Sequence, residues 1–370
     1  MISEDKYKNS GGKRLFEVDS AKFFALIFMV CIHAFEMYVK WDYHEKVPDS
    51  LYRNVMEILG GPFAAPVFMF CMGIGMIYTR HDSPAEFIRR GLKLMITGYI
   101  LNFIRQTLPM LIAMMLHIET GYDLMGGLLN VDIFQFAGMA FITIGLMKKL
   151  RLSHIQMCGV AVLLQAAGIW GTYLKIKSVT VQTLLGLLLP CGEHVAFPMT
   201  LWLMYPVLGM ILGEQLKKTD DKEWLYKKLM VCAALFFLAY TVTLLYIGYD
   251  IRTFYSLSDG SYYFQNILFT LWMTPLIILM IGMCFFILRN MEQTLFGRFI
   301  RYCSVNLKTI YITQWILIGY SYAFSILLGI DKTDSPGWLI FVGFVILGVA
   351  IAISFLYNKI RKCIRKKNKE

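Results

Sequence analysis

Residues 14–36 read R-L-F-E-V-D-S-A-K-F-F-A-L-I-F-M-V-C-I-H-A-F-E, an apolar segment that carries a line of ionisable side chains. On a helix of about 100° per residue, Lys22 and His33 lie eleven positions apart and differ by only about 20° in direction. Asp19 and Glu36 fall within about 60° of that line. The segment therefore predicts a helix with one ionisable seam, formed by Asp19, Lys22, His33 and Glu36.

The ionisable seam indicates function, because charged groups inside a bilayer cost several kcal/mol unless they face a cavity or a partner. The alternative for a single histidine in such a segment is a packing residue that makes one hydrogen bond. Four aligned polar groups favour the functional interpretation over that alternative. His33 is therefore the leading candidate for chemistry in this sequence.

The composition of the whole chain extends this interpretation. Of 370 residues, 57% are hydrophobic and only 16% are charged, and the mean hydropathy is +0.57. These values exclude an ordinary soluble domain and predict an all-α, polytopic membrane protein. The stretch 181–190 is too short to cross a bilayer and ends at Pro190, so we expect it to be re-entrant or interfacial. Ten longer stretches approach the roughly 20 residues needed for a span, and they centre on 20–39, 60–79, 91–114, 131–147, 154–171, 199–216, 229–248, 265–288, 308–328 and 337–357.

The distribution of lysine and arginine predicts how these ten spans are oriented. With the N-terminus in the cytosol, the cytosolic segments hold 28 of the 36 basic residues, and basic-rich loops alternate with basic-poor ones. This is the positive-inside pattern. We therefore expect a cytosolic tail at 1–19, a ten-helix membrane domain at 20–357 and a basic cytosolic tail at 358–370, in a multi-pass protein of the cell membrane.

The net charge of +11 is then a topology signal, so nucleic acid is not expected as a partner. The basic C-terminal tail is expected to touch anionic membrane lipids. Eight cysteines are scattered without a C-x-x-C pair, which predicts neither a disulfide framework nor a metal site. Walker loops, G-x-G-x-x-G after a strand and G-x-S-x-G are absent from the sequence. A polar tail of about 20 residues leads straight into the first span, so we expect no signal peptide.

Polar residues of three spans are expected at one level, in the outer half of the membrane. His33 lies about 13 residues into its span, or about 20 Å from the cytosolic side, and Arg105 reaches a similar depth in the third span. The other members of this layer are Asn102 and Gln106, on one helix face with Arg105, and Asp132 and Gln135 at the start of the fourth span. The layer predicts a cavity. The alternative is a set of hydrogen bonds that hold the helices together.

A second cluster is basic and lies on the cytosolic side, before the third span. Arg89, Arg90 and Lys93 follow Ser83 and Pro84, which are typical of a helix N-cap and the first helical position. A helix start beside guanidinium groups is suited to bind phosphates. The alternative is that these residues only contribute to the positive-inside bias.

These segments together resemble the membrane acyltransferase superfamily, which includes multi-span acyltransferases of bacterial surface glycans and heparan-α-glucosaminide N-acetyltransferase-like proteins. The family's first span carries an Arg, an Asp, and then an Arg or Lys separated by ten residues from an essential His. The positions similar to these are Arg14, Asp19, Lys22 and His33. The resemblance continues in order through Ala65-Pro66-x-Phe68, the pair Arg90 and Lys93, the segment Val131–Gln135, the segment Phe197–Gly213, and Asn306–Gln314. The departures are Lys22 in place of Arg, Phe23 in place of Gly, and Gln314 in place of a late His.

The resemblance implies acyl transfer from acyl-CoA, with acetyl-CoA as the leading donor and no metal, to an extracytoplasmic cell-envelope glycan or lipid-linked sugar. His33 is expected to act as base or acyl carrier, Glu36 to orient its imidazole, and Lys22 to face the donor's phosphates or leaving thiolate. The expected donor-binding residues are Arg14, Arg89, Arg90 and Lys93, and the expected acceptor-binding residues are Asp19, Asn102, Arg105, Gln135, Tyr311 and Gln314.

Two other classes of function stay open at this point. In a transporter or flippase the same ionisable seam would be a substrate or proton pathway. A non-catalytic sensor or assembly partner would use it only for packing. The sequence leaves open the identity of the acceptor, the choice between O- and N-acylation, the acyl chain length, the oligomeric state and whether Gln314 replaces a functional histidine.

Overall fold

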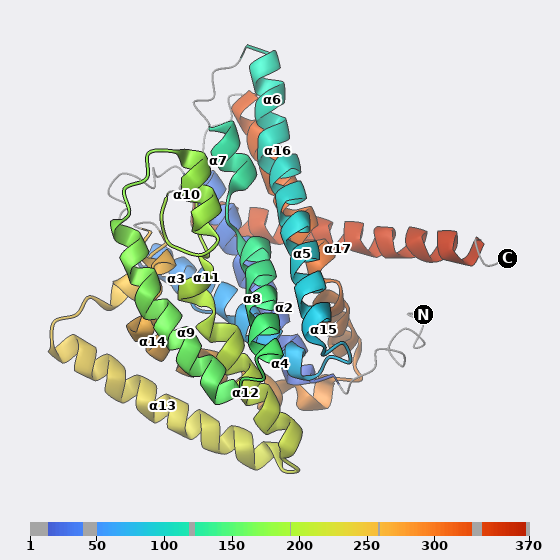
Figure 1. Cartoon of the computed structure of the whole chain (residues 1–370). Coiled ribbons are helices and arrows are strands. Elements are labelled where there is room, and N and C mark those ends of the chain that lie inside the picture. The colour runs from blue at the N-terminus through green and yellow to red at the C-terminus, as the bar shows by residue number, and fades with distance from the viewer. Residues whose placement is uncertain are drawn as a thin grey trace.

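The computed structural model describes residues 14–39, 50–117, 123–192, 194–257, 260–327 and 335–367. Throughout these ranges the chain is helical without a β-strand, and an isolated bridge joins Val131 to Val195. The all-α class is therefore confirmed. Figure 1 shows the helices gathered into one bundle, with α13 along one flank and the end of α17 projecting from the other.

Each of the ten apolar stretches coincides with helix. In chain order the main helices are α2 (Phe16–Tyr38), α3 (Leu51–Gly60), α4 (Ala65–Ile77), α5 (Pro84–Asn102), α6 (Leu108–Met115), α8 (Ile133–Lys149), α9 (His154–Ile169), α11 (Met199–Trp202), α12 (Met204–Lys218), α13 (Lys222–Tyr246), α14 (Ile267–Leu288), α15 (Leu295–Val305), α16 (Leu307–Leu327) and α17 (Pro336–Lys367). The stretch 181–190 overlaps the short helix α10 (Val179–Gly186), which packs against another short helix, α7 (Leu124–Leu129).

Six helical segments are long and apolar enough to cross a membrane, and they support a multi-pass membrane protein. Within the described ranges these are Phe16–Tyr38, Leu51–Ile77, His154–Tyr173, Lys222–Tyr246, Ile267–Met291 and Pro336–Ile364. The count of ten spans and the cytosolic placement of both termini stay predictions, since the other helices are shorter, more polar or interrupted. The expected third span is one of these, because it is divided into α5, a π-helical turn and α6.

Helix α2 occupies the centre of the bundle, which explains how its ionisable seam is shielded from lipid. It packs against α3, α4, α14, α15, α16 and α17, and most of its residues are buried. Around it, small residues allow close helix pairs. A Cβ atom at Gly73 of α4 would collide with the backbone of Pro206 in α12, and one at Gly209 of α12 would collide with the carbonyl of Phe70. These contacts place α12 directly against α4, which packs on α2.

Candidate active site

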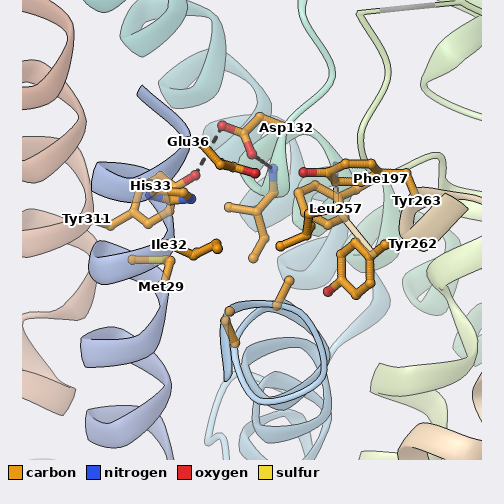
Figure 2. A pocket seen from close by; sticks show the side chains of 14 residues that line it. Met29, Ile32, His33, Glu36, Asp132, Phe197, Leu257, Tyr262, Tyr263 and Tyr311 are labelled. Carbon is orange, nitrogen blue, oxygen red and sulfur yellow. Dashed lines mark hydrogen bonds between the residues drawn. The ribbon is translucent and has the colours of Figure 1, made fainter. Parts of the chain in front are cut away.

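A small cavity lies beside the outer part of α2, where the sequence predicts a polar layer. It is lined by His33 and Glu36 of α2, by Asp132 at the start of α8, and by Tyr311 of α16. Figure 2 shows these side chains on one side and Phe197, Tyr262 and Tyr263 on the other. Its volume of about 40 Å³ is room for a few water molecules or one small functional group. The turn between α3 and α4 contributes Gly60, Ala64 and Ala65.

His33 is held on one edge and one face by α16. Its Nδ1 lies 3.4 Å from Oε1 of Gln314, and its ring centroid lies 4.1 Å from that of Trp315, with 33° between the planes. The other ring nitrogen, Nε2, makes no hydrogen bond within the described part of the chain. An imidazole that is fixed on one side and open to a cavity on the other is arranged for proton or group transfer.

Glu36 lies one helical turn after His33 and borders the same cavity. Among the residues that the structure describes, its carboxyl group has neither an ion pair nor a hydrogen bond. Nearby Glu57 is fully buried, and its carboxylate lies 3.4 Å from the guanidinium of Arg53. The hydrogen-bond partner of the His33 imidazole is the amide oxygen of Gln314, so the orienting role expected for Glu36 stays a prediction. Its carboxyl group is available to a ligand in the cavity.

Asp132 is the carboxylate of the site that accepts the most hydrogen bonds. Its Oδ2 accepts hydrogen bonds from Nη2 of Arg105 at 2.8 Å and from the Tyr311 hydroxyl at 3.1 Å. Its Oδ1 caps α8 by accepting from the backbone N–H of Ile133 at 2.7 Å. Arg105 also donates to Oδ1 of Asn102 at 3.2 Å. The predicted convergence of three spans is therefore present, and it holds one carboxylate at the edge of the cavity.

Arg105 lies in a local widening of the helix. Residues Phe103–Thr107 form a π-helical turn between α5 and α6. Pro109 lacks an N–H and cannot bond the carbonyl of Arg105 in the α-helical pattern, and such a loss commonly widens a helix by one residue. The guanidinium then lies 4.2 Å from the ring centre of Trp315, in a cation–π contact. Arg105 therefore contacts both the carboxylate and the aromatic ring that flank His33.

Buried donors without a partner surround this layer. Nε and Nη1 of Arg105 and Nε2 of Gln314 are buried, and none has a hydrogen bond to a described residue. Unpaired buried donors are costly, so water or a ligand oxygen is expected to bind them. Nε2 of Gln135 is a further buried donor without a described partner, while its Oε1 accepts from the backbone N–H of Asp132 in a capping box at the start of α8. Gln135 therefore holds the backbone of Asp132 in place and does not line the cavity.

The inner end of α2 is a closed polar cluster. The carboxylate of Asp19 accepts from Arg14 at 2.8 and 3.1 Å and from the Ser304 hydroxyl at 2.6 Å. Lys22 is half-buried next to this cluster, and its ammonium has no ion pair or hydrogen bond to the residues described. The structure thus separates the seam into an inner part, in which Asp19 is paired and Lys22 is not, and an outer part that borders the cavity.

The basic residues of α5 lie on its exposed flank and do not line the cavity. Arg89, Arg90 and Lys93 are exposed, and the Arg90 guanidinium lies 4.6 Å from the ring centre of Phe141. The predicted helix start is confirmed, with Ser83 as N-cap in a capping box and Pro84 as the first helical residue. The pKa of Glu86 in that box is lowered by hydrogen bonds from His81 and from Ser83.

Sequence reasoning did not find several neighbours of His33. Trp315 stacks on its ring from a position 282 residues later in the chain, and Tyr262 and Tyr263 close the cavity from a connecting segment. The signal for Trp315 was its position next to Gln314, whereas the tyrosines had none. All eight cysteines are free thiols. Over the described ranges, no three His, Cys, Asp or Glu side chains are grouped to bind a metal ion.

Comparison with known proteins adds one finding. The chain matches the sequence model of a family described as an acyltransferase domain, and the match extends over residues 15–357. This range includes every residue of the cavity and of the α5 basic flank. A search of curated proteins gave no match.

Proposed function

We propose that this chain, which belongs to the membrane acyltransferase family, transfers an acyl group from cytosolic acyl-CoA to an acceptor outside the cytosol. Acetyl is the proposed acyl group, and a cell-envelope glycan or lipid-linked sugar is the proposed acceptor. The observation that carries the proposal is the His33 imidazole, which contacts α16 through Nδ1 and borders a small cavity that Glu36, Asp132 and Tyr311 also line.

The proposed chemistry uses His33 as a general base. Nε2 of His33 takes the proton of an acceptor hydroxyl as the hydroxyl oxygen attacks the thioester carbonyl. The tetrahedral intermediate then collapses, the carbon–sulfur bond breaks, and the thiolate of CoA leaves. The imidazolium returns the proton to that thiolate, so the products are the acylated acceptor and CoA with a free thiol. An amine acceptor would react by the same sequence.

The charges around His33 support this cycle. Asp132 borders the cavity and is ion-paired with Arg105, and a carboxylate near the ring stabilises the imidazolium that forms in the first step. The buried unpaired donors of Arg105 and Gln314 are groups in this layer that can hydrogen-bond to an oxygen atom. Tyr311 and Asn102 act through Asp132 and Arg105, and Gln135 acts through the backbone of Asp132. These residues hold the site in one geometry before a ligand arrives.

The donor is proposed to approach from the cytosolic side. Arg89, Arg90 and Lys93 on the exposed flank of α5 provide cations for the phosphates of CoA, and Arg14 adds a further guanidinium at the start of α2. Lys22 lies eleven residues before His33, or about 16 Å along the helix. Its ammonium is suited to attract the phosphates or the leaving thiolate on the path between the two regions.

The transporter alternative is not favoured, because the chain belongs to an acyltransferase family. One experiment separates the two. Membrane vesicles with the protein are given acyl-CoA and envelope material, and both acylated product and free CoA thiol are measured. We expect acylated product and free CoA thiol in equal amounts from the wild-type protein. Both should be lost in His33→Ala at matched protein level. Movement of envelope material without thiol release would overturn the proposal.

A further inference from the structure

One face of α16 carries the residues that surround the site. Tyr311, Gln314 and Trp315 follow the spacing i, i+3 and i+4, so their side chains emerge on the same side of the helix. Tyr311 donates to Asp132, Gln314 contacts His33, and Trp315 lies against His33 and Arg105. Helix α16 therefore fixes the imidazole and the nearest paired carboxylate relative to each other.

The contact between Gln314 and His33 decides which ring nitrogen carries the proton. A neutral imidazole has one N–H and one lone pair, and the partner of one nitrogen sets the role of both. Oε1 of Gln314, which can only accept, lies 3.4 Å from Nδ1. With the amide oxygen on this side, the contact is a hydrogen bond only when Nδ1 carries the hydrogen. The lone pair is then left on Nε2, which has no partner in the described ranges.

The surroundings of Gln314 allow it to hold this arrangement. Its side chain is completely buried, so bulk water does not compete for the amide oxygen. The ring of Trp315 covers the imidazole at 4.1 Å between centroids and limits its rotation. An amide group neither gains nor loses a net proton near neutral pH, so Gln314 can direct the proton of His33 without taking it.

We propose that Gln314 is a positioning residue that fixes His33 in its Nδ1–H tautomer and so directs the basic Nε2 into the cavity. This inference rests on the proposed function only in assuming that His33 does the chemistry. Both roles considered for His33, base and acyl carrier, require the lone pair on Nε2. The amide of Gln314 thus serves the reaction without touching either substrate.

The direct test is nitrogen-15 NMR of the full-length protein in lipid nanodiscs, with label in the histidine side chains. The chain has six histidines, and the His33 signals are assigned by their loss in His33→Gln. The proposal expects a protonated Nδ1 and an unprotonated Nε2 above the pH at which His33 titrates. A protonated Nε2 with the lone pair on Nδ1 would overturn it. This measurement needs no substrate.

Two variants test what the tautomer does. Gln314→Leu removes the acceptor at similar volume, and we expect a loss of about 10- to 100-fold in kcat, the range for an orienting partner, with little change in KM for acyl-CoA. Gln314→Glu restores an acceptor at the same place and is expected to recover most of that loss. A matched control is Gln165→Leu, because Gln165 is equally buried but bonds Leu201 and Thr270. Equal kcat losses in Gln314→Leu and in Gln165→Leu would make the role of Gln314 structural.

The outcomes separate this inference from the proposed function. If His33→Ala keeps full acyl transfer, the proposed function fails, whatever the tautomer is. If His33→Ala loses transfer while wild-type His33 carries its proton on Nε2, only the role of Gln314 fails. Size-exclusion profiles in detergent show whether each variant is folded, and the NMR measurement on the wild-type protein stands if a variant is not.

Discussion

The two ends of α2 carry similar residues and use them differently. At the inner end, Asp19 accepts hydrogen bonds from Arg14 and Ser304, and so its carboxylate is already occupied. At the outer end, His33 has one bonded nitrogen, and the carboxyl group of Glu36 has no bond to a described residue. Both ends are shielded from lipid. Burial alone therefore raises the free-energy cost of a polar group, whereas incomplete pairing beside a cavity leaves the group available for chemistry.

The orientation of α2 in the membrane decides which of its ends faces the cytosol. Labelling of an engineered cysteine from one side only is expected to show this orientation. We predict ten spans with both termini in the cytosol and the loop Tyr249–Ser261 outside. The probe is Ser258→Cys, at a position outside the described residues, labelled with a membrane-impermeant thiol reagent in intact cells and in inverted vesicles. Labelling only from the cytosolic side would reverse the inner and outer ends of α2, and the direction of transfer with them.

The outer end is expected to show the largest effect on activity. His33→Ala should lower acyl transfer by about 10²–10⁴-fold, the range for loss of a positioned base. His33→Gln should be almost as inactive, because glutamine can hydrogen-bond but cannot take the proton. Both should insert and fold, since the side chain borders a cavity. The measurement is acyl-CoA-dependent labelling of envelope material at matched expression.

The α5 flank is expected to affect donor binding. Arg90→Ala and Lys93→Ala should each raise KM for acyl-CoA by up to about tenfold, with kcat at saturating donor nearly unchanged. The reason is that exposed cations contribute to phosphate binding but do not touch the reacting atoms. Initial rates over a donor titration measure both constants. Unchanged KM in both variants would leave these residues with a role in topology alone.

Glu36 is expected to have a smaller effect than His33 although it borders the same cavity. Glu36→Gln should lower transfer by less than about tenfold, because it tunes the imidazole and does not itself carry the proton. Glutamine cannot titrate, so the part of the rate–pH profile that follows protonation of the Glu36 carboxyl group should be lost in this variant. Rates from pH 5 to 9 test this. A loss as large as that of His33→Ala would make Glu36 part of the proton transfer.

A change at the inner end of α2 is expected to have the smallest effect on acyl transfer and to lower only the stability of the protein. Ser304→Ala removes one hydrogen bond to Asp19, and we expect a loss of about 1 kcal/mol in the free energy of unfolding. The rate of acyl transfer per folded molecule should not change, because the group lies far from the cavity along α2. Thermal unfolding in detergent and the transfer assay give the two values. A large drop in rate with intact stability would make the inner end part of the active site.

The sequence predicted the local features of the site well. The 3.6-residue period placed the ionisable seam on one face of α2, and the depth of each span brought Asn102, Arg105 and Asp132 to one layer. The start of α5 at Ser83 and Pro84 followed from capping chemistry. These features depend on residues close together in the chain or on the fixed thickness of a bilayer, and one sequence contains both kinds of information.

The contacts between distant helices could not be predicted in the same way. Gln314 and Trp315 meet His33 only because α16 packs against α2. The register of that contact depends on side-chain packing along the whole helix pair. The π-helical turn at Phe103–Thr107 also rotates the residues after it by a fraction of a turn. A regular α-helix therefore gives the right partners for Arg105 but does not give its contact with Trp315.

Release of CoA thiol by purified protein in liposomes shows directly whether His33 transfers acyl groups across the membrane. Acetyl-CoA is supplied on the side of the α5 basic flank and envelope material on the side of the His33 cavity, with His33→Ala as the matched control. We expect one free CoA thiol for each acetyl group that reaches the acceptor, and only background release of thiol by His33→Ala. Equal thiol release by wild-type protein and His33→Ala would contradict it.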